Sequence, residues 1–156
     1  MLLLARKSVL AIAAVTDIAV NGGPRPVTAK ALASRYGLPA RHLEPVLQAL
    51  VRHGILKGIR GPRGGYELAQ ERSRISADQI LRAAANADDE VISSVGSQLL
   101  DEVIIPAISE AERAFSTALA RISVEDLTQS AQRLRKSSNA MEHTPSSEQK
   151  PWRESA

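Results

Sequence analysis

Residues 27–68 contain two different apolar patterns in immediate succession, and together they restrict the fold strongly. Thr28 is suited to cap a short helix, because its hydroxyl can accept a hydrogen bond from the first-turn amides, and Gly37 is suited to end that helix. After Leu38-Pro39, apolar residues at i, i+3, i+4, i+7 and i+8 predict a second helix. These apolar residues are Leu43, Val46, Leu47, Leu50 and Val51.

A hairpin is predicted directly after this second helix, which Gly54 closes. Two short extended runs, Leu56–Arg60 and Tyr66–Leu68, are joined by the turn sequence Gly-Pro-Arg-Gly-Gly at 61–65. Helix, tight turn, helix and glycine-rich hairpin is the order of a winged helix-turn-helix. We therefore expect a mainly α fold with a small β-hairpin wing.

Basic and hydrogen-bonding side chains occupy the positions where such a fold meets DNA. The start of a recognition helix presents donors to base edges, and arginines on a glycine-rich tip can enter a narrow minor groove. The candidate DNA-binding residues are Thr28, Arg41, His42, Arg52, Lys57, Arg60, Arg63, Gly64, Gly65 and Tyr66. The alternative is that Arg41 and His42 are solvated helix residues and that the glycine-rich turn is an ordinary hairpin.

The run ILKGIRGPRGGYELA at residues 55–69 resembles the wing of the Rrf-two family of bacterial transcription regulators, of the IscR, NsrR and CymR type. The resemblance extends over roughly residues 1–135. It implies DNA binding and a dimer with crossed long helices. One departure is Pro45, which has no amide donor and clashes with the carbonyl four residues earlier. The second helix is therefore expected to start after Pro45 or to bend there.

Charge and cysteine content restrict the possible functions. Residues 1–75 hold 12 basic and 4 acidic residues, a balance of +8, whereas residues 76–156 hold 8 basic and 13 acidic residues, a balance of −5. Such asymmetry is expected when only the first half meets a polyanion. The absence of cysteine excludes disulfides, thiolate metal sites and redox thiols. Because only 3% of the residues are aromatic, the core must be aliphatic.

The first segment, Met1–Asn21, has two interpretations. Its short apolar run beside Arg6-Lys7 has some features of a secretory signal, but Asp17 interrupts the segment and the cleavage site is poor. We prefer a helix that ends at Asn21 and leaves the protein in the cytoplasm. The residues expected to be partly buried are Val9, Ile12, Ala13, Val15, Ala19 and Val20.

Two later segments begin with helix-capping patterns. Ser76 with Gln79 forms a capping box for a helix from about Ala77 to Ala85, and the pattern recurs from Ile122 to Leu127. Cluster-binding relatives place cysteines at the position of residues 86–98, where this chain has Ser93, Ser94 and Ser97. Serine is a poor iron ligand, so no cofactor is expected. The acidic run 88–90 could hold a hard cation, but an acidic loop or helix start is preferred.

An apolar stripe follows, with alternating steps of four and three residues. It consists of Leu100, Ile104, Ile108, Ala111, Phe115, Leu119 and Ile122. The stripe either packs on the first helix or meets a second copy, and the resemblance favours a homodimer. Pro106 should mark a start or kink of this helix. Residues 137–156 lack apolar periodicity and are expected to be disordered; Trp152 is either a docking anchor or an ordinary tail residue.

The predicted organisation is a winged helix-turn-helix domain at 1–85, a linker at 86–98, a dimerisation helix with a following short helix at 99–136, and the tail. The preferred function is a sequence-specific DNA-binding regulator, a dimeric repressor of a partly palindromic operator, without a cluster. The alternative is a protein-interaction module that regulates a metabolic enzyme. An enzyme is disfavoured because the three histidines form no catalytic or metal-binding pattern. No metal site or membrane contact is expected, and the sequence does not identify an effector.

Overall fold

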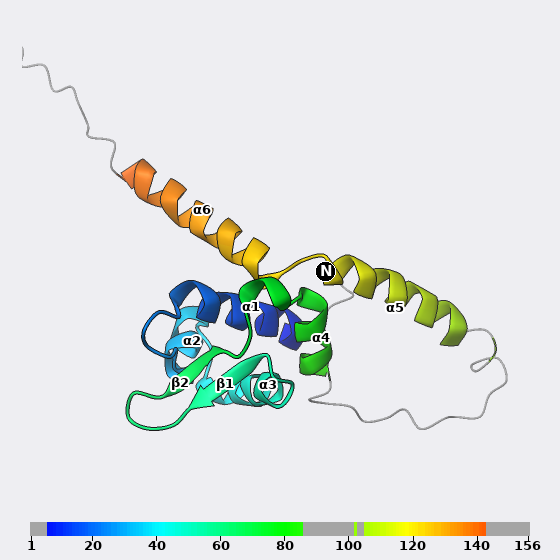
Figure 1. The fold of residues 1–156 in the computed structure, drawn as a ribbon, viewed down its shortest axis with the longest axis horizontal. Coiled ribbons are helices and arrows are strands. Elements are labelled where there is room, and N and C mark those ends of the chain that lie inside the picture. Colours follow the sequence, from blue (N-terminus) through cyan, green and yellow to red (C-terminus); the bar gives the residue numbers. More distant parts are fainter. Residues whose placement is uncertain (1–5, 86–101, 103–104, 143–156) are drawn as a thin grey trace, which may run out of the picture.

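The computed structural model describes residues 6–85, 102 and 105–142, and it confirms a mainly α fold with one antiparallel hairpin (Figure 1). The elements in chain order are α1 Arg6–Asn21, α2 Ala29–Tyr36, α3 Ala40–Arg52, β1 Leu56–Ile59, β2 Gly65–Leu68, the 3-10 turn η1 Arg72–Arg74, α4 Ala77–Ala85, α5 Ile105–Ala120 and α6 Val124–Glu142. No helix of the described ranges is both long and apolar enough to cross a bilayer.

The core lies between α1, α2, α3, α4 and the hairpin, and its fully buried large side chains are almost all aliphatic, as expected. The predicted apolar pattern of α3 is confirmed, because Leu43, Val46, Leu47 and Leu50 are buried and Val51 is half-buried. Their burial holds α3 against the body, so its opposite side remains exposed.

The partial burial predicted for six residues of α1 is confirmed, but the prediction did not include most of the residues that α1 buries fully. Of these six residues, only Val15 is fully buried, and Val9, Ile12, Ala13, Ala19 and Val20 are half-buried. The core side of α1 instead consists of Ala11, Ala14, Val15 and Ile18. Alanines on this side leave room for α4 to lie close to α1, whereas the larger apolar residues flank a groove beside α6.

Both predicted capping boxes are confirmed, and they face each other. The Ser76 amide donates to Gln79 Oε1 at 3.0 Å, and the Ser123 amide donates to Asp126 Oδ2 at 3.0 Å. The two caps form an antiparallel bridge, in which the Ala77 amide donates to the Ile122 carbonyl at 2.8 Å. The starts of α4 and α6 are thereby joined on one side of the body.

The two C-terminal helices project from the body in different directions (Figure 1). Pro106 is the second residue of α5, at the end of the helix where a missing amide costs little. The apolar stripe was expected to run on through Ile122, but α5 ends at Ala120 and Ile122 belongs to the capped turn before α6. Leu100, Ile104 and the side chain of Ile108 lie outside the described residues.

The helix after the stripe is longer than expected. It was predicted to be short and to end before residue 137, but α6 runs for 19 residues to Glu142. Residues 137–142, assigned to a disordered tail, are therefore helical, because no glycine or proline interrupts the chain before Pro145. Residues 1–5, 86–98 and 143–156, including the serine and acidic runs and Trp152, lie outside the described residues.

Candidate nucleic-acid interface

The turn between α2 and α3 has the geometry of a helix-turn-helix. Thr28 caps α2, with its hydroxyl accepting from the Ala31 amide at 3.1 Å. Gly37 ends α2 in the left-handed region, at φ 62°, and the Leu38 amide then closes on the Ala33 carbonyl at 2.9 Å. This tight turn fixes the direction of α3 relative to α2. Thr28, at the other end of α2, is exposed.

Helix α3 begins earlier than Pro45 predicted. It runs from Ala40, and Pro45 lies inside it on the exposed side. Of the two expectations, a helix start after Pro45 is therefore wrong, and a bend at Pro45 stays a prediction. Pro45 is the sixth residue of α3, and it has no amide to donate to the carbonyl of Arg41, four residues earlier.

One exposed face of α3 carries a row of polar side chains. Arg41, Gln48 and Arg52 are exposed and lie seven and four residues apart, so they share one side of the helix. His42 is also exposed, at the third helical position. Sequence reasoning missed Gln48, although its spacing from Arg41 and Arg52 would have placed it on this face. Arginine and glutamine are side chains that read guanine and adenine in the major groove.

Backbone hydrogen bonds join the hairpin to the residue before the α2 cap, and two glycines leave room for this close approach. β1 and β2 pair from Leu56 with Leu68 to Ile59 with Gly65. Tyr66 exchanges two backbone hydrogen bonds with Val27, at 2.8 and 3.0 Å. A Cβ at Gly65 would lie 2.7 Å from the Val27 carbonyl oxygen, and one at Gly64 would lie 2.2 Å from the Ile59 carbonyl oxygen. Both positions therefore require glycine for this wing to form.

The cations of the wing differ in their freedom to meet an anion. Arg60 and Arg63 are exposed at the tip, and neither guanidinium has a hydrogen bond or ion pair within residues 6–85 and 105–142. Lys57 pairs with Glu67 across the hairpin at 3.1 Å, so its charge is partly neutralised. Sequence reasoning placed all three together, but the structure separates the free arginines from the paired lysine.

Tyr66 links the hairpin to α3. Its side chain is half-buried, and its hydroxyl accepts a long hydrogen bond from Gln48 Nε2 at 3.5 Å. Arg41 and Arg52 on α3, like the two tip arginines, have no side-chain partner in the described part of the chain. The structure thus brings four unpaired guanidinium groups onto the α3 and hairpin elements, which lie on the same side of the body (Figure 1).

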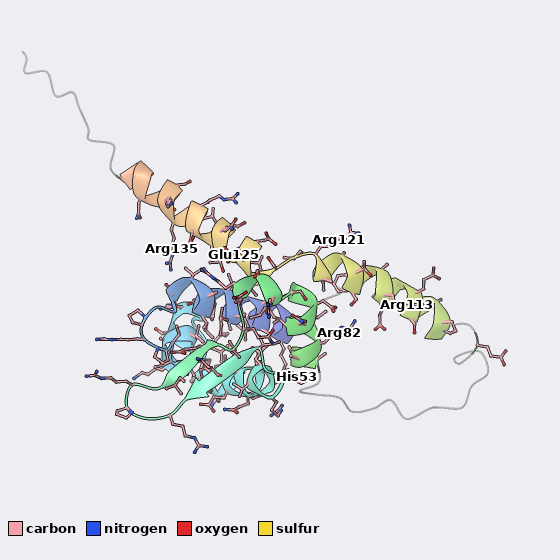
Figure 2. All side chains as sticks on the ribbon, in the orientation of Figure 1. His53, Arg82, Arg113, Arg121, Glu125 and Arg135 are labelled. Carbon is pink, nitrogen blue, oxygen red and sulfur yellow. The ribbon has the colours of Figure 1, made fainter. Side chains whose placement is uncertain are left out.

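His53 and Arg82, both labelled in Figure 2, have different surroundings. His53 Nδ1 lies 2.9 Å from the Ala49 carbonyl of its own helix. Arg82 of α4 donates to Asp78 at 2.9 Å and to Ser116 of α5 at 2.6 Å. Burial raises the pKa of Asp78, but the hydrogen bonds from Ser116 and Arg82 outweigh it, so that pKa lies below its usual range. This cluster ties the α5 arm to the body.

Residues 4–130 match the model of the Rrf2 family, described as an iron-dependent transcriptional regulator. The chain belongs to the Rrf2 family. It is 35% identical over 126 residues to slr0846 of Synechocystis sp., which carries the name of an HTH-type transcriptional regulator; the match covers 80% of this chain and 86% of that protein. It is 30% identical to the HTH-type regulator IscR of Escherichia coli, over 55% of this chain and 53% of IscR.

Solved structures of this Rrf2 type have the same fold. CymR, the global cysteine regulator of B. subtilis, superposes with a TM-score of 0.62 at 26% identity, over 83% of this chain and 98% of CymR. The IscR of T. potens superposes with a TM-score of 0.64 at 26% identity, over 82% of this chain and 87% of that IscR. The predicted winged helix-turn-helix fold and family are thus confirmed. The protein is a DNA-binding transcriptional regulator.

The iron named in the family description does not fit the donors of this chain as a thiolate-bound cluster. The sequence has no cysteine, and the described residues contain no group of three or more His, Asp or Glu side chains arranged around a metal position. Serine hydroxyls are poor ligands for iron beside thiolates.

Proposed function

We propose that the protein acts in the cytoplasm as a dimeric repressor that places two α3 helices and two hairpins on a partly palindromic operator. The observation that carries this proposal is the set of unpaired arginines on α3 and the wing, opposite a buried apolar face. A free guanidinium can bond a phosphate or a base edge without first losing a protein partner. Thr28, His42 and the Lys57 ammonium would add contacts to the sugar–phosphate backbone.

Helix α5 supports a dimer. It stands away from the body and has its main contacts with α4 (Figure 1). Along its stripe, Leu119 is buried, Phe115 is half-buried and Ala111 is exposed. A projecting helix with apolar residues left accessible favours pairing with a second copy. We propose that the interface contains Leu100, Ile104, Ile108, Ala111, Phe115, Leu119 and Ile122.

Sedimentation tests the dimer directly. At micromolar concentration we expect twice the chain mass of 16.7 kDa. A single species of the chain mass would contradict the dimer and, with it, the twofold operator.

The wing contact is tested with Arg63→Ala on a fragment of the protein's own promoter. Two substituted wings remove about two phosphate or groove charges, so the slope of log affinity against log salt should become shallower by roughly 1.8. Arg133→Ala is the matched control, because it removes the same charge from an exposed position of α6, which is part of neither the helix-turn-helix nor the wing. If both variants bind like the parent protein across 50–200 mM salt, the wing does not contact DNA.

A further inference from the structure

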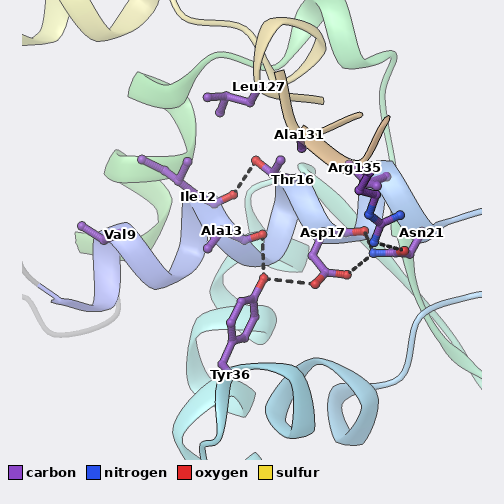
Figure 3. A pocket seen from close by; sticks show the side chains of 11 residues that line it. Val9, Ile12, Ala13, Thr16, Asp17, Asn21, Tyr36, Leu127, Ala131 and Arg135 are labelled. Atoms are coloured by element: carbon purple, nitrogen blue, oxygen red, sulfur yellow. Dashed lines mark hydrogen bonds between the residues drawn. The ribbon is translucent and has the colours of Figure 1, made fainter. Parts of the chain in front are cut away.

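A groove of about 530 Å³ runs between α1 and α6, with Tyr36 of α2 at its floor (Figure 3). This volume lies within the range of small-molecule sites. The α1 wall extends from Val9 to Asn21, about 18 Å at 1.5 Å per residue. The groove is therefore long and narrow, and it is separate from α3 and the hairpin.

The walls of the groove are apolar over most of their length. The half-buried side chains that form them are Val9, Ile12, Ala13, Val20, Leu127 and Ala131. Thr16 adds no free donor, because its hydroxyl donates to the Ile12 carbonyl at 2.9 Å. A ligand that fills these walls needs an extended apolar body.

Polar groups gather at one end of the groove, and most of them are already paired. Asp17 accepts from Asn21 Nδ2 at 2.7 Å and from the Tyr36 hydroxyl at 3.3 Å, and it forms an ion pair with Arg35. Burial first, and then the charge of Asp17, raise the pKa of Tyr36 above its usual range. The Asp17 carboxylate is thus neutralised within the protein and leaves no net negative charge for a cationic ligand.

Arg135 is the one charged lining residue of the groove whose charge is not offset. Its Nη2 donates to the neutral Asn21 Oδ1 at 2.9 Å, and within the described residues its guanidinium has no carboxylate partner. Figure 3 shows it reaching from α6 toward Asn21 and Asp17. The remaining guanidinium donors match a carboxylate, which arginine binds with two parallel hydrogen bonds.

We propose that this groove binds an aliphatic carboxylic acid, with the carboxylate on Arg135 and the hydrocarbon chain along the α1 and α6 walls. Charge complementarity selects the head group, and the length of the apolar walls selects an extended chain over a compact amino acid. The head-group end is connected to α2 by the contacts of Asn21 with Asp17 and of Asp17 with Arg35. A ligand on Arg135 would therefore be linked to the helix-turn-helix through this chain of polar contacts.

The test uses the full chain and decanoate as the probe, with binding measured by titration calorimetry below the micellar range. Saturable binding of decanoate, with 1-decanol and decylammonium at least fivefold weaker, is the expected result. Arg135→Gln should weaken decanoate binding roughly five- to tenfold. Arg133→Gln, on the same helix but outside the groove, should leave it unchanged.

Filling the walls gives a second test. Ala131→Phe and Ile12→Phe should each abolish decanoate binding, while thermal unfolding reports whether each variant remains folded. Equal binding of decanol, or no effect of Arg135→Gln, would overturn the carboxylate site. If decanoate never saturates and Ala131→Phe turns a dimer into a monomer in sedimentation, the groove holds a second copy and the proposal fails. Decanoate binding needs no DNA, so its loss leaves the operator proposal standing, and the reverse also holds.

Discussion

Gly65→Ala should destabilise the protein, because Gly65 is where the wing is joined to the body. Gly65 has φ 153°, and an alanine there carries a backbone cost of about 1–3 kcal/mol. The new Cβ would lie 2.7 Å from the Val27 carbonyl oxygen and 2.8 Å from its carbon, both backbone atoms. Relief of this clash breaks the two Val27–Tyr66 hydrogen bonds, worth about 0.5–1.5 kcal/mol each. The free energy of unfolding should fall by roughly 2–6 kcal/mol.

Urea denaturation followed by circular dichroism measures this loss, which at a typical urea dependence moves the midpoint down by roughly 1–3 M. Gly58→Ala is the matched control in the same hairpin, because no described atom lies within 4 Å of a Cβ built there. It should stay within about 0.5 kcal/mol of the parent protein. An unchanged midpoint for Gly65→Ala would show that the contact with Val27 does not hold the wing.

Two further substitutions test side chains that the structure singles out. Gln48→Ala should reduce discrimination at one base pair per half-site by about 1–3 kcal/mol while leaving the salt slope unchanged, as measured by competition between operator variants. Tyr36→Phe removes the hydrogen bond to the Ala13 carbonyl, at 2.9 Å, and should cost about 1 kcal/mol near neutral pH. Because the pKa of Tyr36 is raised, the parent protein keeps this stability below its ordinary pKa near 10 and loses it at higher pH. Urea midpoints at pH 8 and 10.5 should therefore converge for parent and variant; a constant gap would contradict the pKa shift.

The sequence predicted those parts of the fold that local chemistry determines. The capping boxes at Ser76 and Ser123, the glycine end of α2 and the bounds of α4 depend on a few neighbouring atoms, and all were predicted correctly. The partly buried residues of α1 were predicted correctly, but the fully buried Ala11, Ala14 and Ile18 could not be predicted in this way. The sequence of α1 is apolar on several sides, so only the positions of α4 and α6 decide that Ile18 faces the core and Ile12 faces a groove.

The candidate interface was predicted in part for a similar reason. Glycine and arginine in a turn indicate a wing without any knowledge of tertiary structure. Whether each basic side chain is paired with a carboxylate or free depends on its neighbours in the fold. The pairing of Lys57 with Glu67 follows from the hairpin register, which the turn length left undetermined at the sequence level. Gln48 carries no charge and was therefore not among the predicted contacts, although its spacing from Arg41 and Arg52 places it on the same exposed face of α3. Their contacts with DNA stay a prediction.

The contacts of Tyr66 suggest that the wing and α3 hold a fixed position relative to each other when they contact DNA. Its backbone bonds Val27, the residue before the α2 cap, and its hydroxyl accepts from Gln48 on α3. The hairpin is thus fixed to both helices of the helix-turn-helix through one residue. A shift of α2, such as a change in the Asp17 network that holds Arg35, would move Val27 and therefore the wing arginines relative to Gln48. In the proposed dimer, two such units would have to match the spacing of two half-sites, so a small displacement in each protomer would be enough to weaken operator binding.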